Sequence, residues 1–362
     1  MEKTMEKPNC IYHDVHVIQT VPPSCVNRDD TGSPKTAIYG GVQRARVSSQ
    51  SWKRAIRKLF QEDTVGVRTK KIVQMIVDEI QEKDNTKTTD MAKKLAKNAL
   101  AKCGKKGITL DKSDNAKSLF FLSHKQAQNL AQLLLTDNNP DKAKVEKILQ
   151  DNPSIDIALF GRMVADDPTL NADASAQVAH SISTHRVDNE YDYFTAVDDL
   201  APEDNAGAGM IGVVEFNSAT LYRYATVAVH ELNRELGMEK ELTMEAVAEF
   251  VKAFILSMPT GKQNTFANRT LPDAVLVIIR RDQPVNLVGA FEKPVKAGES
   301  GYVQESIKRL ENYAEKVYTS FAKAPEKSWG IGLKEGNAGS LNLDTLIDEI
   351  KEQVAADLET VK

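Results

Sequence analysis

The chain has 362 residues, 41% of them hydrophobic and 27% charged, which is enough for one large domain with insertions or for two domains. Its formal net charge of -4 excludes a globally basic nucleic-acid coat, so any polyanion site must come from local clusters of Lys and Arg. The three cysteines have no CxxC spacing, so we expect neither disulfides nor a Cys-based zinc site. No apolar run reaches the roughly 20 residues of a membrane span, and the N-terminus is polar, so we expect a cytoplasmic protein.

The first third of the chain begins with a strand pattern. Alternating β-branched residues predict a strand over 11–21, which Pro22 and Pro23 end. A loop rich in Asp, Gly and Pro covers 27–41, and 43–47 forms a short strand. Ser48 and Ser49 offer a helix N-cap, so we expect a helix over 50–60.

Residues 61–153 differ in composition from what precedes them. Lysines are dense, and apolar residues recur with a helical period, as in the set Ile72, Met75, Ile76 and Ile80 and the set Met91, Leu95 and Ala99. We therefore predict a helical insertion of several short helices, closed by the Asp-Asn-Pro sequence at 151–153.

The second half mixes both periods. The pattern predicts a strand over 155–164, a helix over 174–184 and a β-rich region over 193–228. The glycine-rich stretch 203–212 interrupts that region as a hairpin tip, which we expect to be disordered in the unbound protein.

The C-terminal third is mainly helical. Thr243 is the expected N-cap of a helix that runs to about 258, the apolar run 274–279 is a buried strand, and 305–322 and 341–358 are helices. The order of elements predicts an α+β fold, compatible with a ferredoxin-like core of the kind found in RNA recognition motifs.

Residues 28–58 carry the strongest chemical signal. Eight basic residues against Asp29 and Asp30 give this stretch a local charge of +6 within an acidic protein. Arg44 and Arg46 share one strand face, Lys53 and Arg57 share one helix face, and free N–H groups at the helix start attract phosphate. These groups could converge on one ligand with repeated phosphates, but an ordinary solvated basic surface explains the charge as well.

The local sequence resembles a known family. The stretches SCVNRDD at 24–30, GGVQRARVSSQSWKRA at 40–55, DIALFGRM at 156–163 and DYFTAVDDL at 192–200 closely resemble the CasC family, the backbone subunit of the type I-E CRISPR Cascade complex. Residues 216–225, 261–265 and 290–296 fit it too. The likeness covers most of the chain and is weakest over 61–150.

The resemblance implies a fold like a right hand, with a modified RNA-recognition-motif palm. The implied parts are the palm at 1–60, 156–195 and 225–362, the last with C-terminal helices, helical fingers at 61–155 and a thumb hairpin at 196–224. Several copies would line one CRISPR guide RNA beside other Cascade subunits. Each thumb would kink the RNA and leave short segments free to pair with target DNA.

The resemblance also implies which residues hold the RNA. Lys35, Ser48, Gln50, Lys53 and Arg57 would contact its backbone, Met163 would wedge between bases, and Phe194 and Thr195 would lie at the kink. Such contacts ignore base identity, as a reader of many guides requires. The full set of expected RNA-binding residues is Arg28, Lys35, Arg44, Arg46, Ser48, Ser49, Gln50, Lys53, Arg54, Arg57, Met163, Phe194, Thr195 and Lys262.

An enzyme is the alternative. Related subunits of type III complexes cut RNA with an acidic loop residue, so Asp29 and Asp30 could form a metal-dependent ribonuclease site. We favour the interpretation that both cap turns or pair with neighbouring cations. His13 and His16 fall on opposite faces of a strand, and no P-loop, GxSxG or HExxH motif occurs. We therefore expect no catalysis, no metal and no cofactor.

Overall fold

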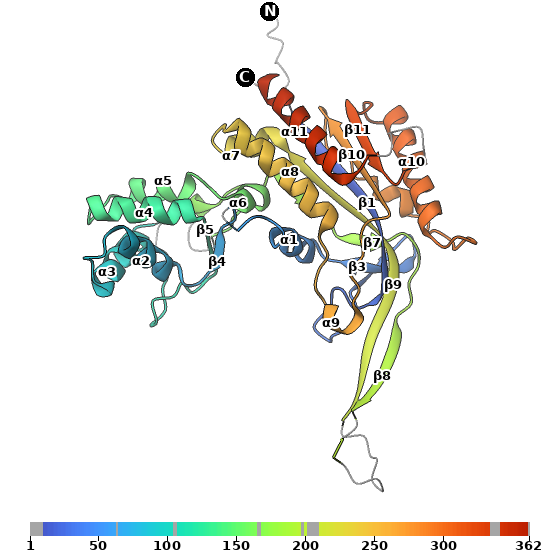
Figure 1. Cartoon of the computed structure of the whole chain (residues 1–362), viewed down its shortest axis with the longest axis horizontal. Helices are drawn as coiled ribbons and strands as arrows, with labels where there is room; N and C mark the ends of the chain where they lie inside the picture. Colours follow the sequence, from blue (N-terminus) through green and yellow to red (C-terminus); the bar gives the residue numbers. More distant parts are fainter. Residues whose placement is uncertain are drawn as a thin grey trace, which may run out of the picture.

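The computed structural model describes residues 10–62, 64–103, 107–164, 168–196, 199–200, 210–333 and 341–360. It is elongated, with a bundle of helices at one end, a large sheet domain at the other and a two-stranded hairpin that projects from the sheet (Figure 1). The predicted α+β class is confirmed.

A single antiparallel sheet forms the body of the protein. In the described residues its order is β11-β10-β1-β9-β7-β3-β2, while β6 and β8 pair separately with β9. The strands are β1 (Tyr12–Ser24), β2 (Thr36–Tyr39), β3 (Val42–Val47), β6 (Ala176–Val178), β7 (Ser181–Ser183), β8 (Glu190–Ala196), β9 (Met210–Ala228), β10 (Ala274–Arg280) and β11 (Lys327–Ile331).

Strand β1 lies in the middle of the sheet, and both of its faces are buried. Val15 and Val17 pack into the core on one face, and Ile18 packs into a second core on the other. The prediction that Pro22 and Pro23 end this strand is wrong, since Ser24 still pairs with Asn217. The register shifts between Val21 and Ser24, and such an irregularity accommodates residues that lack an N–H donor.

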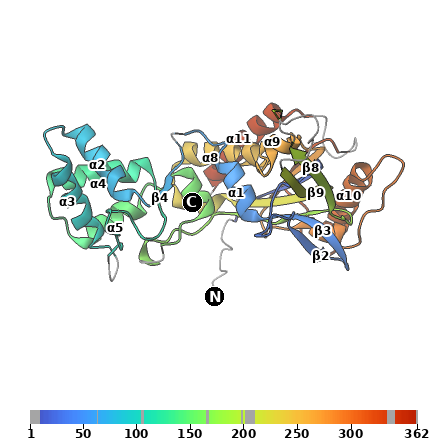
Figure 2. The same cartoon turned by 90° about the horizontal axis from the view of Figure 1, so that it is seen from below.

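Helices cover both faces of the sheet. The helices α1 (Ser49–Arg57), α7 (Val229–Glu235), α8 (Lys240–Leu256) and α11 (Leu343–Thr360) contribute to the main core on one face. A short helix, η3 (Leu287–Phe291), and α10 (Val303–Ser320) cover the other face. Figure 2 shows α8 and α11 on the opposite side of the sheet from α10. The predicted strand at 274–279 and the two C-terminal helices are confirmed.

The helical unit, residues 64–154, confirms the predicted insertion. It consists of α2 (Ile72–Lys83), α3 (Thr89–Leu100), α4 (His124–Thr136), α5 (Lys142–Gln150) and a small sheet of β4 (Val67–Thr69) and β5 (Phe120–Leu122). It has a hydrophobic core of its own. The predicted face of α3 is confirmed for Ala99, which is buried, and for Leu95, which packs against this core, but Met91 is exposed and the helix buries Ala92 and Ala96 as well.

Three element predictions are wrong. Residues 155–160 form α6 (Ile155–Phe160) where a strand was expected, and 174–184 form β6 and β7 where a helix was expected. A short apolar run does not distinguish a buried helix from a strand, and pairing with β9 overrides the helical propensity of 174–184. Helix α8 begins at Lys240, so Thr243 is buried inside it and is no N-cap.

The projecting hairpin consists of β8 and the first part of β9, which confirms the β-rich region. Its strands pair from Glu190 with Phe216 to Ala196 with Met210. Residues 203–209 of the predicted disordered tip lie outside the described residues, and 210–212 belong to β9. Among the described residues, no helix is long and apolar enough to cross a membrane.

Two buried ionisable groups on β1 change the free energy of unfolding in opposite directions as the pH falls. Burial, with a smaller effect from Arg280, lowers the pKa of His16 from 6.5 to about 3, so the stability linked to this histidine is present above pH 6.5 and is lost as the pH falls. Burial raises the pKa of Asp14 from 3.8 to about 6, despite hydrogen bonds from Val285 and Tyr224, so its contribution is present below pH 3.8 and is lost as the pH rises through 6.

Because the two effects partly cancel between pH 6 and 4, Asp14→Asn should expose the histidine effect. We expect the free energy of unfolding of this variant to fall more steeply from pH 6 to 4 than that of the parent protein. Urea unfolding at stepped pH measures both slopes. Parallel curves for the two proteins would show that Asp14 does not bind a proton in this range.

Candidate nucleic-acid interface

Helix α1 begins as the sequence predicts. The Ser48 hydroxyl accepts a hydrogen bond from the Ser51 N–H at 3.3 Å, and the Ser48 N–H donates to Asn27 Oδ1 at 2.9 Å. The predicted N-cap is confirmed, although the helix ends at Arg57 and not at residue 60. Ser49 and Gln50 lie in the first turn, which contains no acidic residue, so its N–H groups face no competing carboxylate of that turn.

The buried side of α1 fixes its orientation on the sheet. Trp52 is 1% exposed, and its Nε1–H donates to Ser181 Oγ at 2.9 Å. The Arg223 guanidinium carbon lies 3.8 Å from the Trp52 ring centroid. With Trp52, Ala55 and Ile56 buried, the basic residues of α1 form two outward rows, Arg54 with Lys58 and Lys53 with Arg57.

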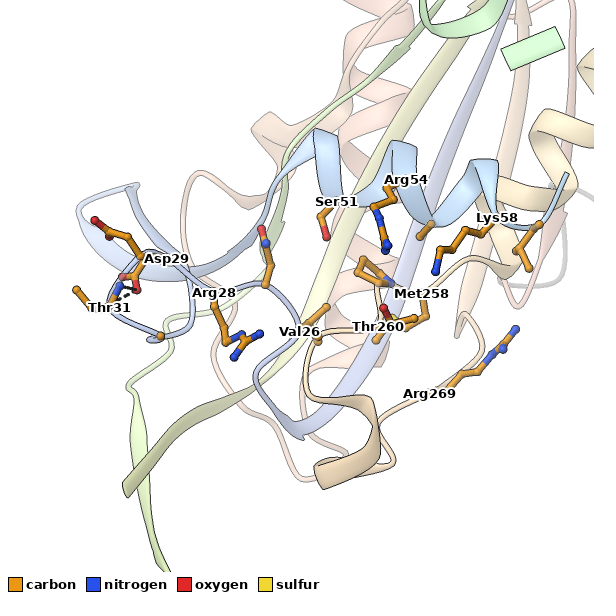
Figure 3. A pocket seen from close by; sticks show the side chains of 17 residues that line it. Val26, Arg28, Asp29, Thr31, Ser51, Arg54, Lys58, Met258, Thr260 and Arg269 are labelled. Carbon is orange, nitrogen blue, oxygen red and sulfur yellow. Dashed lines mark hydrogen bonds between the residues drawn. The ribbon is translucent and has the colours of Figure 1, made fainter. Parts of the chain in front are cut away.

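The first row lines an open groove. We call it the basic groove; its volume is about 680 Å³, and it is lined by 26–32, by Ser51, Arg54, Ala55, Lys58 and Leu59, and by 258–261 and Arg269. Figure 3 shows Arg54 and Lys58 extending from α1 toward Met258 and Thr260, with Arg28 and Arg269 on either side. None of these four cations forms an ion pair within the described parts of the chain.

Asp29 stabilises a turn in the wall of the basic groove. Its Oδ1 accepts hydrogen bonds from the Thr31 N–H at 3.0 Å, the Thr31 hydroxyl at 2.7 Å and the Ser33 N–H at 3.0 Å. The Thr31 hydroxyl bond is the main reason why the pKa of this carboxyl lies below its ordinary value. The favoured interpretation of Asp29 as turn chemistry is confirmed. No group of three or more His, Cys, Asp or Glu able to hold a metal occurs among the residues that the structure describes.

Gly261 allows two walls of the groove to meet. A Cβ added at this position would lie 2.0 Å from the Val26 carbonyl oxygen, so any larger residue must push the segment 258–261 away from 25–26. We expect Gly261→Ala to cost about 1–3 kcal/mol in strain and to weaken the RNA binding that the family resemblance implies about tenfold, with the salt slope unchanged.

Fluorescence anisotropy at several salt concentrations measures both quantities. The matched control is Gly298→Ala, where the nearest atom to the new Cβ is 3.9 Å away. Equal affinity of the two alanine variants would mean that the contact between the walls is not needed for binding.

The second row of α1 faces the helical unit. Lys53 is half-buried with its Nζ 5.5 Å from the Phe160 ring centroid, and burial lowers the pKa of its amine. Arg57 forms an ion pair with Asp156, with 2.7 Å between Nε and Oδ2. Met163, just beyond α6, is 83% exposed, so its apolar side chain lies in solvent.

On the hairpin, Phe194 and Thr195 belong to β8. Phe194 is 37% exposed, and the tip of its ring covers Gly212 of β9, where an added Cβ would be 2.3 Å from Cζ. Thr195 is exposed opposite Ile211. The hairpin therefore presents an aromatic ring whose position depends on a glycine across the strand pair.

Arg44 is no RNA ligand, which corrects the prediction. It is 0% exposed, and its guanidinium donates to four backbone carbonyl oxygens, those of Tyr39, Ser183, Phe291 and Glu292. A group enclosed in this way holds η3 onto the sheet and has no surface for a phosphate.

Arg46 shares the face of β3 that carries Arg44. It is half-buried, donates to the Thr36 carbonyl oxygen and bonds His180 Nδ1 at 3.0 Å. The opposite face of β3, with Ala45 and Val47, packs with Trp52 of α1. The two arginines therefore lie across the sheet from α1, so the predicted convergence of the strand pair and the helix on one ligand is wrong.

Lys35 and Lys262 do not line the basic groove, and two residues that do line it were missed by the prediction. Lys35 is half-buried beyond the turn of Asp29, and Lys262 follows Gly261 at the start of α9 (Gln263–Phe266) with φ of 49°. Lys58 and Arg269 were not predicted as site residues. The spacing of four from Arg54 was a signal for Lys58, but nothing in the local sequence marks Arg269.

The comparisons with known proteins decide the family. The sequence pattern of the family described as CT1975-like protein matches residues 13–356. The chain belongs to this family.

Solved structures give the same result. A chain described as "CRISPR RNA-guided surveillance complex, pre-nicking" is 32% identical with a TM-score of 0.82, covering 95% of this chain and 100% of that one. A second, described as "CRISPR RNA-guided surveillance complex", is 29% identical with a TM-score of 0.63, covering 94% and 99%. The predicted resemblance to the CasC family is thereby confirmed. No curated protein matches the chain.

Proposed function

We propose that this chain is a non-catalytic backbone subunit of a CRISPR RNA-guided surveillance complex and that it binds guide RNA along the basic groove. The observation that carries the proposal is the set Arg28, Arg54, Lys58 and Arg269, four cations from three separate segments around one groove without ion-pair partners in the described structure. Unpaired cations that converge from separate segments suit a ligand with repeated phosphates.

The finer parts of the proposal follow the family resemblance. In it the sheet domain acts as a palm of the RNA-recognition-motif type, the helical unit as fingers and the β8–β9 hairpin as a thumb. Lys35, Ser49, Gln50, Lys53 and Lys262 contact the RNA backbone, while Met163, Phe194 and Thr195 act where the RNA kinks. Several copies line one guide in a cytoplasmic type I-E complex with other Cascade subunits and present it to target DNA. The exposed apolar side chains of Met163 and the hairpin support stacking without base preference.

Binding to single-stranded RNAs of equal length and unrelated sequence tests the proposal. We expect equal affinities, a steep loss of affinity with salt and no cleavage of labelled RNA in Mg²⁺ or Mn²⁺. Light scattering should show a monomer without RNA and particles that grow with RNA length. Sequence-selective binding would contradict a backbone role, and cut RNA would favour a ribonuclease.

A further inference from the structure

Three chain segments link the helical unit to the sheet domain, and two of them meet beside α1, while the third follows α6 and packs Val164 and Leu170 into the core of the helical unit. The chain leaves α1, passes Gly66 and enters β4, and it returns through Ser154 into α6. The two segments touch, since the Ile155 N–H donates to the Thr64 carbonyl oxygen at 3.1 Å. Figure 1 shows α1 beside this junction, between the helical unit and the sheet. Contacts where these two segments meet therefore contribute to the orientation of the helical unit.

A single buried carboxylate organises the junction. Asp156 is 0% exposed, and its Oδ1 accepts hydrogen bonds from the Gly66 N–H at 2.9 Å and the Ser154 hydroxyl at 2.6 Å. Its Oδ2 accepts from Arg57 Nε at 2.7 Å. One side chain thus bonds the outgoing segment, the returning segment and α1. A buried carboxylate held by three donors is well satisfied, and the loss of its cation would leave a buried charge unpaired.

Arg57 completes the junction from the side of α1. Its Nη2 donates to the Gly66 carbonyl oxygen at 3.3 Å, and its guanidinium carbon lies 4.6 Å from the Phe121 ring centroid in β5. Gly66 fits because a Cβ there would be 2.7 Å from Ser154 Oγ and 3.0 Å from the Leu122 carbonyl oxygen. The guanidinium therefore contacts both backbone and ring of the helical unit, with geometry that an ammonium group does not reproduce.

We infer that the Arg57–Asp156 pair is a lock that fixes the orientation of the helical unit on α1, and that Arg57 is a positioning residue and not a ligand of RNA phosphate. Helix α1 also carries Arg54 and Lys58 into the basic groove, so the lock sets how the helical unit and Met163 stand relative to that groove. The orienting role is independent of RNA. Its consequence for RNA binding rests on the proposed function.

Distance measurements without RNA test the orienting role. Paired spin labels on Lys94→Cys in α3 and Asn312→Cys in α10, both exposed positions, report the placement of the helical unit in a Cys10→Ser background, with Cys25 and Cys103 buried. We expect one narrow distance distribution that broadens with Arg57→Gln and with Asp156→Asn. The control Arg54→Gln, exposed and outside the junction, should leave it narrow. Unchanged distributions in both junction variants would overturn the inference, whether or not the protein binds RNA.

RNA affinity separates a positioning residue from a phosphate ligand. We expect Arg57→Gln and Asp156→Asn to weaken binding by similar factors, and the double variant to be no weaker than either, because both break the same pair. The salt slope should stay unchanged. A slope lower by about 0.7 in Arg57→Gln, with Asp156→Asn binding normally, would instead identify Arg57 as a phosphate ligand.

The variant Arg57→Lys is the milder test, should either neutral variant fold poorly. It keeps the positive charge but cannot donate to Asp156 and to the Gly66 carbonyl oxygen in the same fork. If the Arg57–Asp156 pair fixes the orientation of the helical unit, Arg57→Lys should broaden the distance distribution and weaken RNA binding. Unaltered distances together with full affinity would overturn the inference, because any nearby cation serves a phosphate equally well.

Discussion

The double variant Arg54→Glu, Lys58→Glu is expected to bind single-stranded RNA about 100-fold more weakly than the parent protein in low salt. Both side chains are exposed and face the basic groove, and neither forms an ion pair within the described residues. If each cation binds one phosphate, the slope of log affinity against log salt should fall by about 0.7 for each cation that is replaced. Anisotropy titrations with several unrelated RNA sequences measure both effects, which should be the same for every sequence.

The matched control reverses two charges elsewhere. Lys308 and Lys316 are exposed on α10, on the opposite face of the sheet from α1. Lys308→Glu, Lys316→Glu changes the net charge by the same amount, so it should reproduce only the weak effect of overall charge on binding. If the two double variants lose equal affinity, the groove is not the RNA site. If affinity is lost for only some sequences, the groove contacts bases and not the backbone.

Local rules predicted the parts of the site that local chemistry determines. Ser48 caps α1 because its hydroxyl reaches a backbone N–H three residues on, and this is visible in sequence as a serine before a helical pattern. The two rows of basic residues on α1 were predictable because residues four apart in the sequence share one face of a helix. The hairpin follows from alternating β-branched and aromatic residues on either side of a glycine-rich stretch.

Burial and long-range packing explain what the sequence did not predict. The alternation rule correctly places Arg44 and Arg46 on one strand face, but only the packing of η3 decides that Arg44 is enclosed while Arg46 is half-buried. Arg269 reaches the groove because 258–261 packs against 25–26, an arrangement that no local pattern encodes. Tertiary packing therefore selects which cations remain available to a ligand.

The misassigned helix α6 shows a different limit. Its apolar residues suit a buried strand equally well, yet helix signals were present. Asp156 lies in its first turn, and Gly161 follows its end with φ of 77°. Asp156 is buried because it bonds α1 and the Gly66 backbone at the junction. A charged residue within an apolar run therefore indicated a buried polar network, which the length and hydrophobic period of the run did not reveal.

The variant Trp52→Ala is expected to lower the free energy of unfolding by about 4 kcal/mol, the largest stability loss predicted for α1. The ring is 1% exposed, lies against the Arg223 guanidinium and fills the core between α1 and the sheet. Its removal leaves a cavity and deprives Ser181 Oγ of its indole donor in a site that is 0% exposed. Urea unfolding followed by circular dichroism measures the loss.

Trp52→Phe separates the contribution of ring packing from that of the hydrogen bond to Ser181. Phenylalanine keeps most of the apolar volume but lacks the Nε1–H, so we expect a loss of about 1–2 kcal/mol, mainly from the unpaired Ser181 hydroxyl. Because Arg54 and Lys58 leave α1 on the side opposite Trp52, the phenylalanine variant should keep the parent RNA affinity and salt slope. A phenylalanine variant as unstable as the alanine variant would mean that the hydrogen bond to Ser181, and not ring packing, anchors α1 beneath the basic groove.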